Sequence, residues 1–398
     1  MKGMIALIFI ALPLFTQGQI LLSPQAEIRA ITVGPYQGEV YSAFGHSGIR
    51  VVDPVNRINA FYNYGIFDYD QPNFYLHFAR GFLNYRLAVT DYDRVLNYYA
   101  YHQDRYFHEQ ILNLDSAQNQ KLFEFLVWNA KPENMYYYYD YFYDNCATRV
   151  RDAIEDTFEG KVEFDGSYIS TDYTIRDLTD VYLPHQPWGD LGIDLCLGLP
   201  MDKKATPYMY MFLPDYIEST FNNATILKNG KKVPLVRNTI ITYSPKGNVS
   251  IIKTWITPLV AFIALFVVGG MLTFWAYKKG KSLFWFDATL LSVIGLVGWL
   301  LFLLWVATDH KAAAKNMNLL WAVPFHFPMG LYLLSSKGKR LKVKYFTAIA
   351  ILMILLLFSW AFLPQDLHEA LIPLTLLVLL RSLYIRYRLS QTNPDERT

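Results

Sequence analysis

The chain is poor in cysteine, in net charge and in repeated sequence. Among 398 residues it has two cysteines, Cys146 and Cys196, and its formal net charge is +2. No basic stripe stands out in its polar half, which argues against a nucleic-acid-binding protein. The sequence contains no internal repeat and no group of His, Cys and Asp residues at metal-ligand spacing. We therefore expect no nucleic-acid partner, no metal and no cofactor.

Apolar sequence is abundant instead, and it is unevenly distributed. Residues 1–18 combine Lys2, an apolar stretch of roughly ten residues and the small residue Gly18, which is the pattern of a secretory signal peptide. An uncleaved anchor is the alternative. Either one predicts that residues 19–253, which carry most of the acidic and turn-forming residues, are exported from the cytoplasm.

Five apolar runs follow, each close to the ~20 residues that cross a bilayer core. They are Thr254–Tyr277, Leu283–Val306, Met317–Leu334, Tyr345–Pro364 and Leu371–Leu389. Basic residues follow the first and third runs, and Arg381 to Arg388 lie at the end of the fifth, so the positive-inside rule puts those ends in the cytoplasm. The sequence thus predicts about five transmembrane helices over residues 254–389 and a cytoplasmic tail over 390–398. It predicts a multi-pass protein of the bacterial inner membrane, with residues 19–253 in the periplasm.

The exported region contains both strand-like and helical segments. Glu39–Pro54 and Ile58–Phe67 are rich in β-branched and aromatic residues, which predicts a pair of strands. Capping residues and helical spacing predict helices over 115–130 and 147–158. The remaining expected elements are an extended segment at 136–143, helices at 177–182 and 207–221, and a hairpin turn at Asn229-Gly230.

Cys146 follows a run of tyrosines, at the point where an extended segment is expected to become a helix. Asp144 and Asn145 supply N-cap chemistry, so the helix dipole and backbone N–H groups such as that of Ala147 would favour a thiolate. The same N–H groups would stabilise an oxyanion when a carbonyl is attacked. This position indicates a nucleophile. An inert core cysteine and a Cys146–Cys196 disulfide are the alternatives, the latter because disulfides persist in exported proteins.

A thiol nucleophile needs a base, and His46 has the best context among the eight histidines. It lies in the strand-like segment YSAFGHSGIR, where small neighbours leave room for a partner. A third residue that orients the base is expected on the paired strand, with Asn63 as the first choice. Asp53, which stands beside Pro54, is the second choice. A purely structural histidine is the alternative to this assignment.

Three stretches together carry a family resemblance: FGHSGIRVVDP, FYNYGIF and FLVWNAKPENMYYYYDYFYDNCATRVRDAI. With the C-terminal apolar region, they resemble the lipoprotein N-acyltransferase (Lnb) family of Bacteroides-type bacteria over essentially the whole chain. More distantly, a histidine strand followed by an Asn-Cys helix start is similar to permuted papain-like proteins of the NlpC/P60 and lecithin:retinol acyltransferase-like (LRAT-like) types. Only Asn145 and Cys146 match the distant motif, because Ala147 and Thr148 stand where those relatives have Glu-His.

The resemblance implies an α+β, permuted papain-like (NlpC/P60-like) exported domain fused to an all-α transmembrane bundle. It implies an enzyme that takes an acyl chain from a membrane phospholipid onto Cys146 as a thioester, with His46 as the base. The acceptor would be the N-terminal amine of a diacylglyceryl-cysteine lipoprotein, and the product a triacylated lipoprotein. The implied partners are therefore a phospholipid donor and a diacylated lipoprotein acceptor.

Several residues near the expected site are candidates for substrate contacts. Arg149 and Arg151 are candidates for binding a phosphate, and Tyr143, His185 and Trp188 for contacting other parts of a substrate. The segment 185–196 is expected to form a lid or a pocket wall. Each of these residues has a purely structural role as its alternative.

Two other functions are compatible with the same residues. A thiol hydrolase, either a phospholipase or an NlpC/P60-type cell-wall amidase or peptidase, would use the same nucleophile and base and would admit water to the thioester. A non-enzymatic membrane assembly factor would hold Cys146 and Cys196 in a disulfide. The apolar runs favour a lipid substrate, because a wall peptidase needs at most one membrane anchor.

Overall fold

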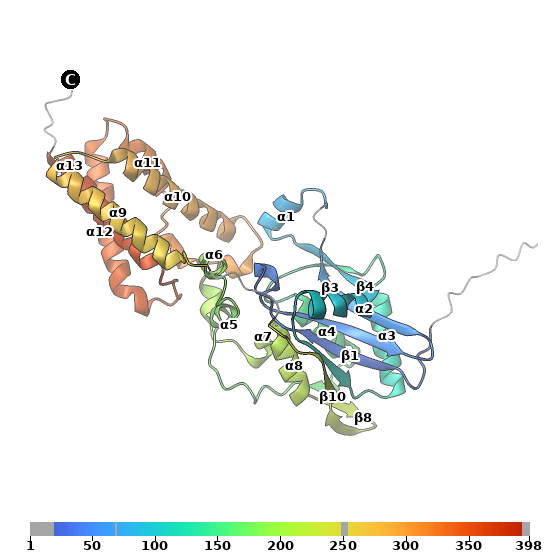
Figure 1. Cartoon of the computed structure of the whole chain (residues 1–398). Helices are drawn as coiled ribbons and strands as arrows, with labels where there is room; N and C mark the ends of the chain where they lie inside the picture. The colour runs from blue at the N-terminus through green and yellow to red at the C-terminus, as the bar shows by residue number, and fades with distance from the viewer. Residues whose placement is uncertain (1–19, 68–69, 248–253, 392–398) are drawn as a thin grey trace, which may run out of the picture.

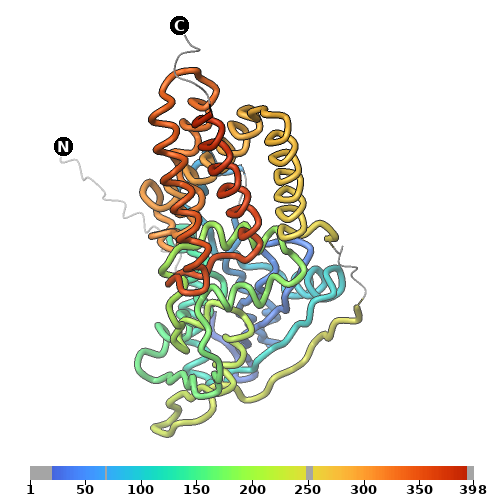
Figure 2. Tube along the Cα trace, turned by 90° about the vertical axis from the view of Figure 1, so that its left-hand side faces the viewer, coloured from blue at the N-terminus to red at the C-terminus, as the bar shows by residue number. Residues whose placement is uncertain are grey.

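The computed structural model describes residues 20–67, 70–247 and 254–391 (Figure 1). A sheet-containing domain comes first in the chain, and a region of long helices extends from one side of it. Figure 2 shows the same division from another side, with the yellow-to-red helices gathered at one end. The predicted signal peptide, residues 1–18, lies outside the described residues.

A seven-stranded antiparallel sheet forms the framework of the first domain, with the strand order β10-β5-β1-β2-β3-β4-β6. The strands are β1 (Glu27–Val33), β2 (His46–Asp53), β3 (Ile58–Ile66), β4 (Asn84–Asp91), β5 (Phe107–Leu112), β6 (Tyr136–Tyr138) and β10 (Val236–Tyr243). The pairing of β2 with β3 confirms the predicted pair of strands. The start of the first predicted strand is instead a short turn of 3-10 helix, η1 (Val40–Ser42).

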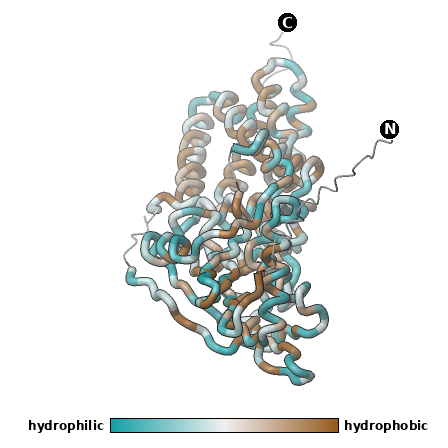
Figure 3. Tube along the Cα trace, turned by 90° about the vertical axis from the view of Figure 1, so that its right-hand side faces the viewer, coloured by the Kyte–Doolittle hydropathy of each residue, from teal (hydrophilic) through white to brown (hydrophobic). Residues whose placement is uncertain are grey.

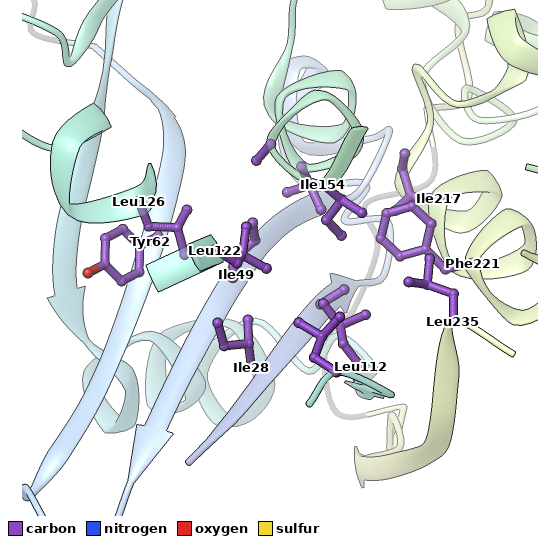
Figure 4. Close-up of a cluster of buried hydrophobic side chains, with 14 of the residues drawn as sticks. Ile28, Ile49, Tyr62, Leu112, Leu122, Leu126, Ile154, Ile217, Phe221 and Leu235 are labelled. Carbon is purple, nitrogen blue, oxygen red and sulfur yellow. The ribbon is translucent and has the colours of Figure 1, made fainter. Parts of the chain in front are cut away.

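Three helices cover one face of this sheet: α3 (Ser116–Asn129), α4 (Cys146–Thr157) and α8 (Pro214–Asn223). The bounds of α3 and α4 agree with the predicted helices to within one residue at each end. In Figure 4, Leu122, Ile154 and Phe221 of the three helices belong to one cluster with Ile49 of β2. Burying each such side chain contributes roughly 1.5–3 kcal/mol relative to leaving it exposed. The start of α4 is therefore positioned by a well-packed core.

The alternation of side chains divides the residues of β2 and β3 between the two faces of the sheet. Ile49 and Tyr62 point to the helices, in the core of Figure 4. Phe61 and, by the same alternation, His46 and Asn63 lie on the opposite face. There the sheet is covered by α2 (Tyr92–Leu96) and the π-helix η2 (Asn97–His102).

Two predicted elements are shorter than expected. The tyrosine run is a strand only over β6, because the chain then turns where the Asp140 carboxylate accepts hydrogen bonds from the N–H groups of Phe142 and Tyr143. The helix expected at 207–221 is divided into α7 (Pro207–Tyr210) and α8. Pro214 begins α8 and has no N–H with which to continue α7.

The predicted hairpin is confirmed. Asn229 and Gly230 both have positive φ (51° and 74°), as a type I′ turn requires, and they join two paired strands. The other elements of this domain are α1 (Phe74–Arg80), α5 (Ile175–Asp180), α6 (Pro187–Cys196), η3 (Leu199–Asp202), β7 (Val162–Glu163), β8 (Thr225–Lys228) and β9 (Lys231–Pro234). Helix α5 lies close to the helix expected at 177–182.

The C-terminal region is helical, and Figure 3 shows that its helices are largely apolar. They are α9 (Pro258–Lys278), α10 (Phe284–Val306), η4 (Lys311–Ala313), η5 (Met317–Leu320), α11 (His326–Leu333), α12 (Lys339–Ser359), η6 (Trp360–Phe362) and α13 (Leu371–Gln391). Among the described residues, three helices are long and apolar enough to cross a membrane: α9, α10 and α12 extended by η6.

Two of the five expected spans differ from a simple apolar crossing. The third is divided into η5 and the eight-residue α11, with Pro324 between them. The fifth, α13, has 21 residues but carries arginines, of which Arg381 is buried against Asp287 of α10 at 2.6 Å. The number of about five spans therefore stays a prediction.

A buried polar network joins the two regions. Arg176 of α5 is 1% exposed and pairs with Asp194 of α6 at 2.7 Å and with Asp202 of η3 at 2.8 Å. Side chains between the long helices bind the same segment, since the amides of Asn316 and Gln365 donate to backbone carbonyls at the end of α6 (2.7 and 3.0 Å). These contacts fasten the sheet-containing domain to the helical region.

Candidate active site

Cys146 is the first residue of α4, and Asn145 caps that helix. The Asn145 side chain accepts hydrogen bonds from the backbone N–H groups of Ala147 (2.9 Å) and Thr148 (3.0 Å), and its amide donates to the Phe212 carbonyl (2.8 Å). The Thr148 hydroxyl accepts in return from the Asn145 N–H, which completes a capping box. The predicted helix start is confirmed, and the cysteine lies at the positive end of the helix.

His46 is the first residue of β2, and its imidazole is held by Asn63 of β3. The Nε2 atom of His46 lies 2.8 Å from the Oδ1 atom of Asn63. Because an amide oxygen can only accept, Nε2 carries the proton in this arrangement and Nδ1 is the basic nitrogen. The structure thus brings together the expected base and the first choice for the residue that orients it.

Asp53, the second choice for that role, lies at the other end of β2, roughly 24 Å from His46 along an extended strand. It is fully buried, and its carboxylate accepts hydrogen bonds from Ser23 and Asn56. Burial raises the pKa of Asp53, but these hydrogen bonds outweigh burial and hold the pKa at about 2. Asp53 therefore organises a turn and does not reach the histidine.

The sulfur of Cys146 lies beside the start of β2, where the backbone N–H groups of Ser47 and Ala147 interact with it. Gly65 of β3 lies close by, since a Cβ atom built on it would be 3.6 Å from the Cβ of Cys146. Gly65 has a φ of +86° at an irregularity in β3 and leaves space at the thiol. The thiol and the His46 imidazole therefore share one region, although neither of these described side chains donates a hydrogen bond to the other.

Arg105 is a residue of this site that the sequence reasoning missed. It is 3% exposed, its Nε donates to the Gly34 carbonyl at 2.5 Å, and its guanidinium lies 4.8 Å from the centre of the Tyr99 ring. The Tyr99 ring packs against the His46 ring with 5.5 Å between centroids. Within the described part of the chain, no carboxylate pairs with Arg105, and its Nη2 has no hydrogen-bond partner. A buried, unneutralised positive charge thus lies beside the histidine.

No feature of the sequence pointed to this arginine. Arg105 follows Asp104 in a segment rich in charge, which is typical of a solvated surface. Its burial depends on the π-helix η2, which places Tyr99 between the guanidinium and His46. π-Helices are rare and often occur at functional sites, so η2 is the local feature that marks this position.

Burial controls the protonation of both reactive groups. Burial and the charge of Arg105 lower the pKa of His46 from 6.5 to about 4, and the hydrogen bond to Asn63 opposes this shift. Burial raises the pKa of the Cys146 thiol above 9, and the backbone N–H groups and the Arg105 charge oppose that shift. At neutral pH the site therefore holds a neutral thiol and a neutral imidazole.

The arginines expected to contact substrate have partners within the protein. Arg149 forms an ion pair with Asp144 and stacks on Tyr137 at 4.1 Å. Arg151 pairs with the neighbouring Asp152 at 2.6 Å. A phosphate would have to displace these contacts, so the structure lends no support to a phosphate site at either arginine.

The remaining expected contacts lie at the surface or at the junction of the two regions. Tyr143 and His185 are exposed. Trp188 donates to the Ile256 carbonyl at 2.7 Å and packs against Phe262 of α9. The segment 185–196 is mainly helix α6, which packs on the helical region through Leu191 and Leu195 rather than forming the expected lid or pocket wall.

Both cysteines are free thiols in this structure. Cys196 is exposed at the end of α6, in the segment that packs on the helical region, whereas Cys146 is half-buried at the start of α4. The alternative in which the two form a structural disulfide is therefore not supported.

Comparison with known families gives two matches that together cover most of the chain. The Lnb N-terminal periplasmic domain matches residues 25–181, which include His46, Asn63 and Cys146. The Lnb transmembrane domain matches residues 250–393. No curated protein and no solved structure gives a significant match. The chain is therefore a membrane protein of the Lnb family, with a periplasmic domain followed by a transmembrane region.

Proposed function

We propose that the protein transfers an acyl chain from a membrane phospholipid, through a thioester on Cys146, to the N-terminal amine of diacylglyceryl-cysteine lipoproteins. Membership of the Lnb family indicates a function related to lipoprotein N-acylation. The observation that carries the proposal is the convergence of a helix-start cysteine with an Asn63-oriented histidine. A half-buried thiol in a domain that precedes a membrane region in the chain supports a lipid as the donor.

In the first step the Nδ1 atom of His46 takes the proton from the Cys146 thiol. The sulfur attacks an ester carbonyl of the phospholipid, so a C–S bond forms and the ester C–O bond breaks. His46 returns the proton to the departing oxygen, which leaves as a lysophospholipid alcohol. The products of this step are the thioester on Cys146 and the lysophospholipid.

In the second step the lipoprotein amine attacks the thioester carbonyl. A C–N bond forms, the C–S bond breaks, and His46 moves a proton from the amine to the sulfur. A model α-amine has a pKa of about 8, so His46 acts on an only moderately basic group. The products are an N-acylated lipoprotein and the restored thiol.

Backbone N–H groups would stabilise the oxyanion in both steps. Those of Ser47 and Ala147 already interact with the sulfur, and they come from the start of β2 and the first turn of α4. Removing one such donor typically costs about 10²–10³ in rate. The Arg105 charge acts in the same direction, because it favours negative charge on the sulfur.

The proposal also includes the fold of the exported domain and the position of each part of the chain relative to the membrane. An antiparallel sheet with a histidine strand and a helix-start cysteine is compatible with a permuted papain-like domain, and we keep that assignment as part of the proposal. We place residues 19–253 in the periplasm, 254–389 in the inner membrane as a multi-pass bundle and 390–398 in the cytoplasm, after a signal peptide at 1–18. The basic residues that follow α9 and those at the start of α12 support this orientation.

The test measures the mass of a lipoprotein's N-terminal lipopeptide in cells that lack their own N-acyltransferase. Wild-type protein should add one acyl chain, whereas Cys146→Ala and His46→Gln should not. The Cys196→Ser variant is the matched control and should act as wild type. Equal restoration by Cys146→Ala would overturn the mechanism, and release of free fatty acid without lipopeptide acylation would identify a hydrolase.

A further inference from the structure

A pocket of about 780 Å³ lies on the same face of the sheet as His46 and Asn63. Asn84 and Arg86 of β4 form its floor, and Tyr138 and Tyr136 of β6 stand opposite them in register. Residues directly opposite each other on antiparallel strands project to the same face. The pocket is therefore a built feature of the sheet edge and not a gap between loops.

The pocket lies a short distance along the sheet from the proposed catalytic residues. Asn63 is paired with Ala88, and Arg86 lies two residues further along β4 on the same face. Diagonal neighbours of this kind are roughly 7–8 Å apart. On the other side of Arg86 stands Ile66, which follows Gly65, and Gly65 lies against Cys146. A ligand held by Arg86 would thus have part of its length within reach of the site.

Helix α1 forms a further wall of the pocket through His77, and it faces away from the core. None of its residues is buried, and Tyr75 and Leu76 are 78% and 57% exposed. A helix with such exposed apolar side chains needs an apolar environment on its outer side.

A membrane surface would supply that environment, because α1 is attached to the end of α10. The Asp309 N–H donates to the Arg80 carbonyl at 2.9 Å, and the His310 ring lies 3.1 Å from the Phe78 carbonyl. Trp305, next to the last residue of α10, is exposed, as expected at a membrane interface. Figure 1 shows α1 between the long helices and the sheet.

The polar groups of the pocket fit a phosphate ester. The Arg86 guanidinium offers donors arranged for a bidentate contact with phosphate oxygens, and Asn84 and His77 add further donors. Among the described residues, no carboxylate forms an ion pair with Arg86. The aromatic side chains of Tyr136 and Tyr138 would cover the glycerol part of a lipid.

We infer that this pocket binds the phosphodiester headgroup of an outer-leaflet phospholipid and presents its ester to Cys146. The inference rests on the proposed acyl transfer and adds the site of the donor. A free phosphate ion makes no apolar contacts, so it would not account for the exposed apolar side of α1. The diacylglyceryl group of the acceptor lipoprotein carries no phosphate for Arg86 to bind.

The experiment measures acyl-thioester formation on the purified full chain with two labelled donors. One donor is phosphatidylglycerol in mixed micelles, and the other is p-nitrophenyl palmitate, which has no phosphate. The variants are Arg86→Gln and Arg86→Lys, with Arg94→Gln as a matched control on the exposed surface of α2. We expect Arg86→Gln to raise the half-saturating phosphatidylglycerol concentration about tenfold or more, since a charge-assisted contact is lost. Arg86→Lys should recover part of that loss.

Labelling by p-nitrophenyl palmitate should be the same in all variants, which also shows that they are folded. Equal half-saturation for Arg86→Gln and Arg94→Gln would overturn the inference. So would an effect of Arg86→Gln on the lipoprotein concentration instead of the phospholipid concentration, or protection by inorganic phosphate at phospholipid-like concentrations. Failure of the wild type to label Cys146 from either donor would instead overturn the proposed function itself.

Discussion

The Nε2 atom of His46 and the Oδ1 atom of Asn63 are 2.8 Å apart, although 17 positions separate the residues in sequence. The hydrogen bond joins two neighbouring antiparallel strands and fixes both the orientation and the tautomer of the imidazole. It leaves Nδ1 to take the proton of the thiol. This relationship makes Asn63 a positioning residue, and it can be tested separately from the reactive groups.

Asn63→Ala should lower kcat/KM for thioester formation about 10- to 100-fold, because a small misplacement of the base costs that much in rate. Asn59→Ala is the matched control, since Asn59 lies on the same strand and accepts a hydrogen bond from Arg50 at 3.0 Å, away from the histidine. The rate of acylation by a labelled phospholipid is the measurement. Equal rates for the two variants would show that Asn63 does not position His46.

The acid limit of activity should lie near pH 4. The pKa of His46 is lowered from 6.5 to about 4 by burial and by the Arg105 charge, so the imidazole stays neutral and basic throughout the range above that value. The pH profile of kcat/KM for the free enzyme reports this group. An acid limb centred near pH 6.5 would contradict the assignment of His46 as a base with a lowered pKa.

The same shift makes folding depend on pH. Between pH 6.5 and 4 the unfolded chain binds a proton on His46 that the folded chain does not bind. The free energy of unfolding should therefore fall as the pH falls through this window. Thermal unfolding of wild type and His46→Gln from pH 4 to 7 provides the measurement, and the variant should lose less stability. Parallel curves would show that His46 titrates normally in the folded protein.

Arg105 should control the reactivity of Cys146. Arg105→Met removes the positive charge that opposes the effect of burial on the thiol, so the pKa of Cys146 should rise further. Each unit of that rise lowers the thiolate fraction, and the rate of iodoacetamide labelling, about tenfold. The measurement is labelling against pH in a Cys196→Ser background, with Arg94→Met as the control.

The pH profile of activity distinguishes an electrostatic role of Arg105 from a purely structural one. The His46 pKa is lowered partly by the same charge, so Arg105→Met should also move the acid limb of activity to higher pH. Loss of folding would instead reduce activity at every pH without moving the limb. A variant that labels and titrates as wild type would remove Arg105 from the mechanism.

Local patterns were sufficient to predict the elements that carry the reactive residues. Helix α4 begins at Cys146 because Asn145 and Thr148 form a capping box, and this pattern can be recognised from four consecutive residues. The pairing of β2 with β3 follows from alternation and a short connection, and it brings Asn63 to His46. These features depend on residues that are close in sequence, or on strands that are adjacent along the chain.

What the sequence did not predict depends on distant segments. The burial of Arg105 comes from its contacts with Gly34 and Tyr99, and the residues next to Arg105 in the sequence predict neither contact. The segment 185–196 was expected at the site, but the sequence carries no information about which surface its apolar residues meet. The division of the third expected span shows the same limit, since the length of an apolar run does not fix a continuous helix.

The buried pairs of Arg176 should hold α6 and η3 in the positions from which they bind the membrane region. Arg176→Met leaves Asp194 and Asp202 buried without their cation, and breaking a buried pair in this way costs about 3–5 kcal/mol of unfolding free energy. Arg237→Met is the matched control, because its ion pair with Glu27 is largely exposed and is expected to contribute about 0–1 kcal/mol. Thermal unfolding of the full chain in detergent, followed by tryptophan fluorescence, measures both. If Arg176→Met unfolds no earlier than Arg237→Met, the network does not hold the two regions together. If it does unfold earlier, the cation is required to hold α6 and η3 in place, because no other positive side chain forms an ion pair with Asp194 or Asp202 among the described residues.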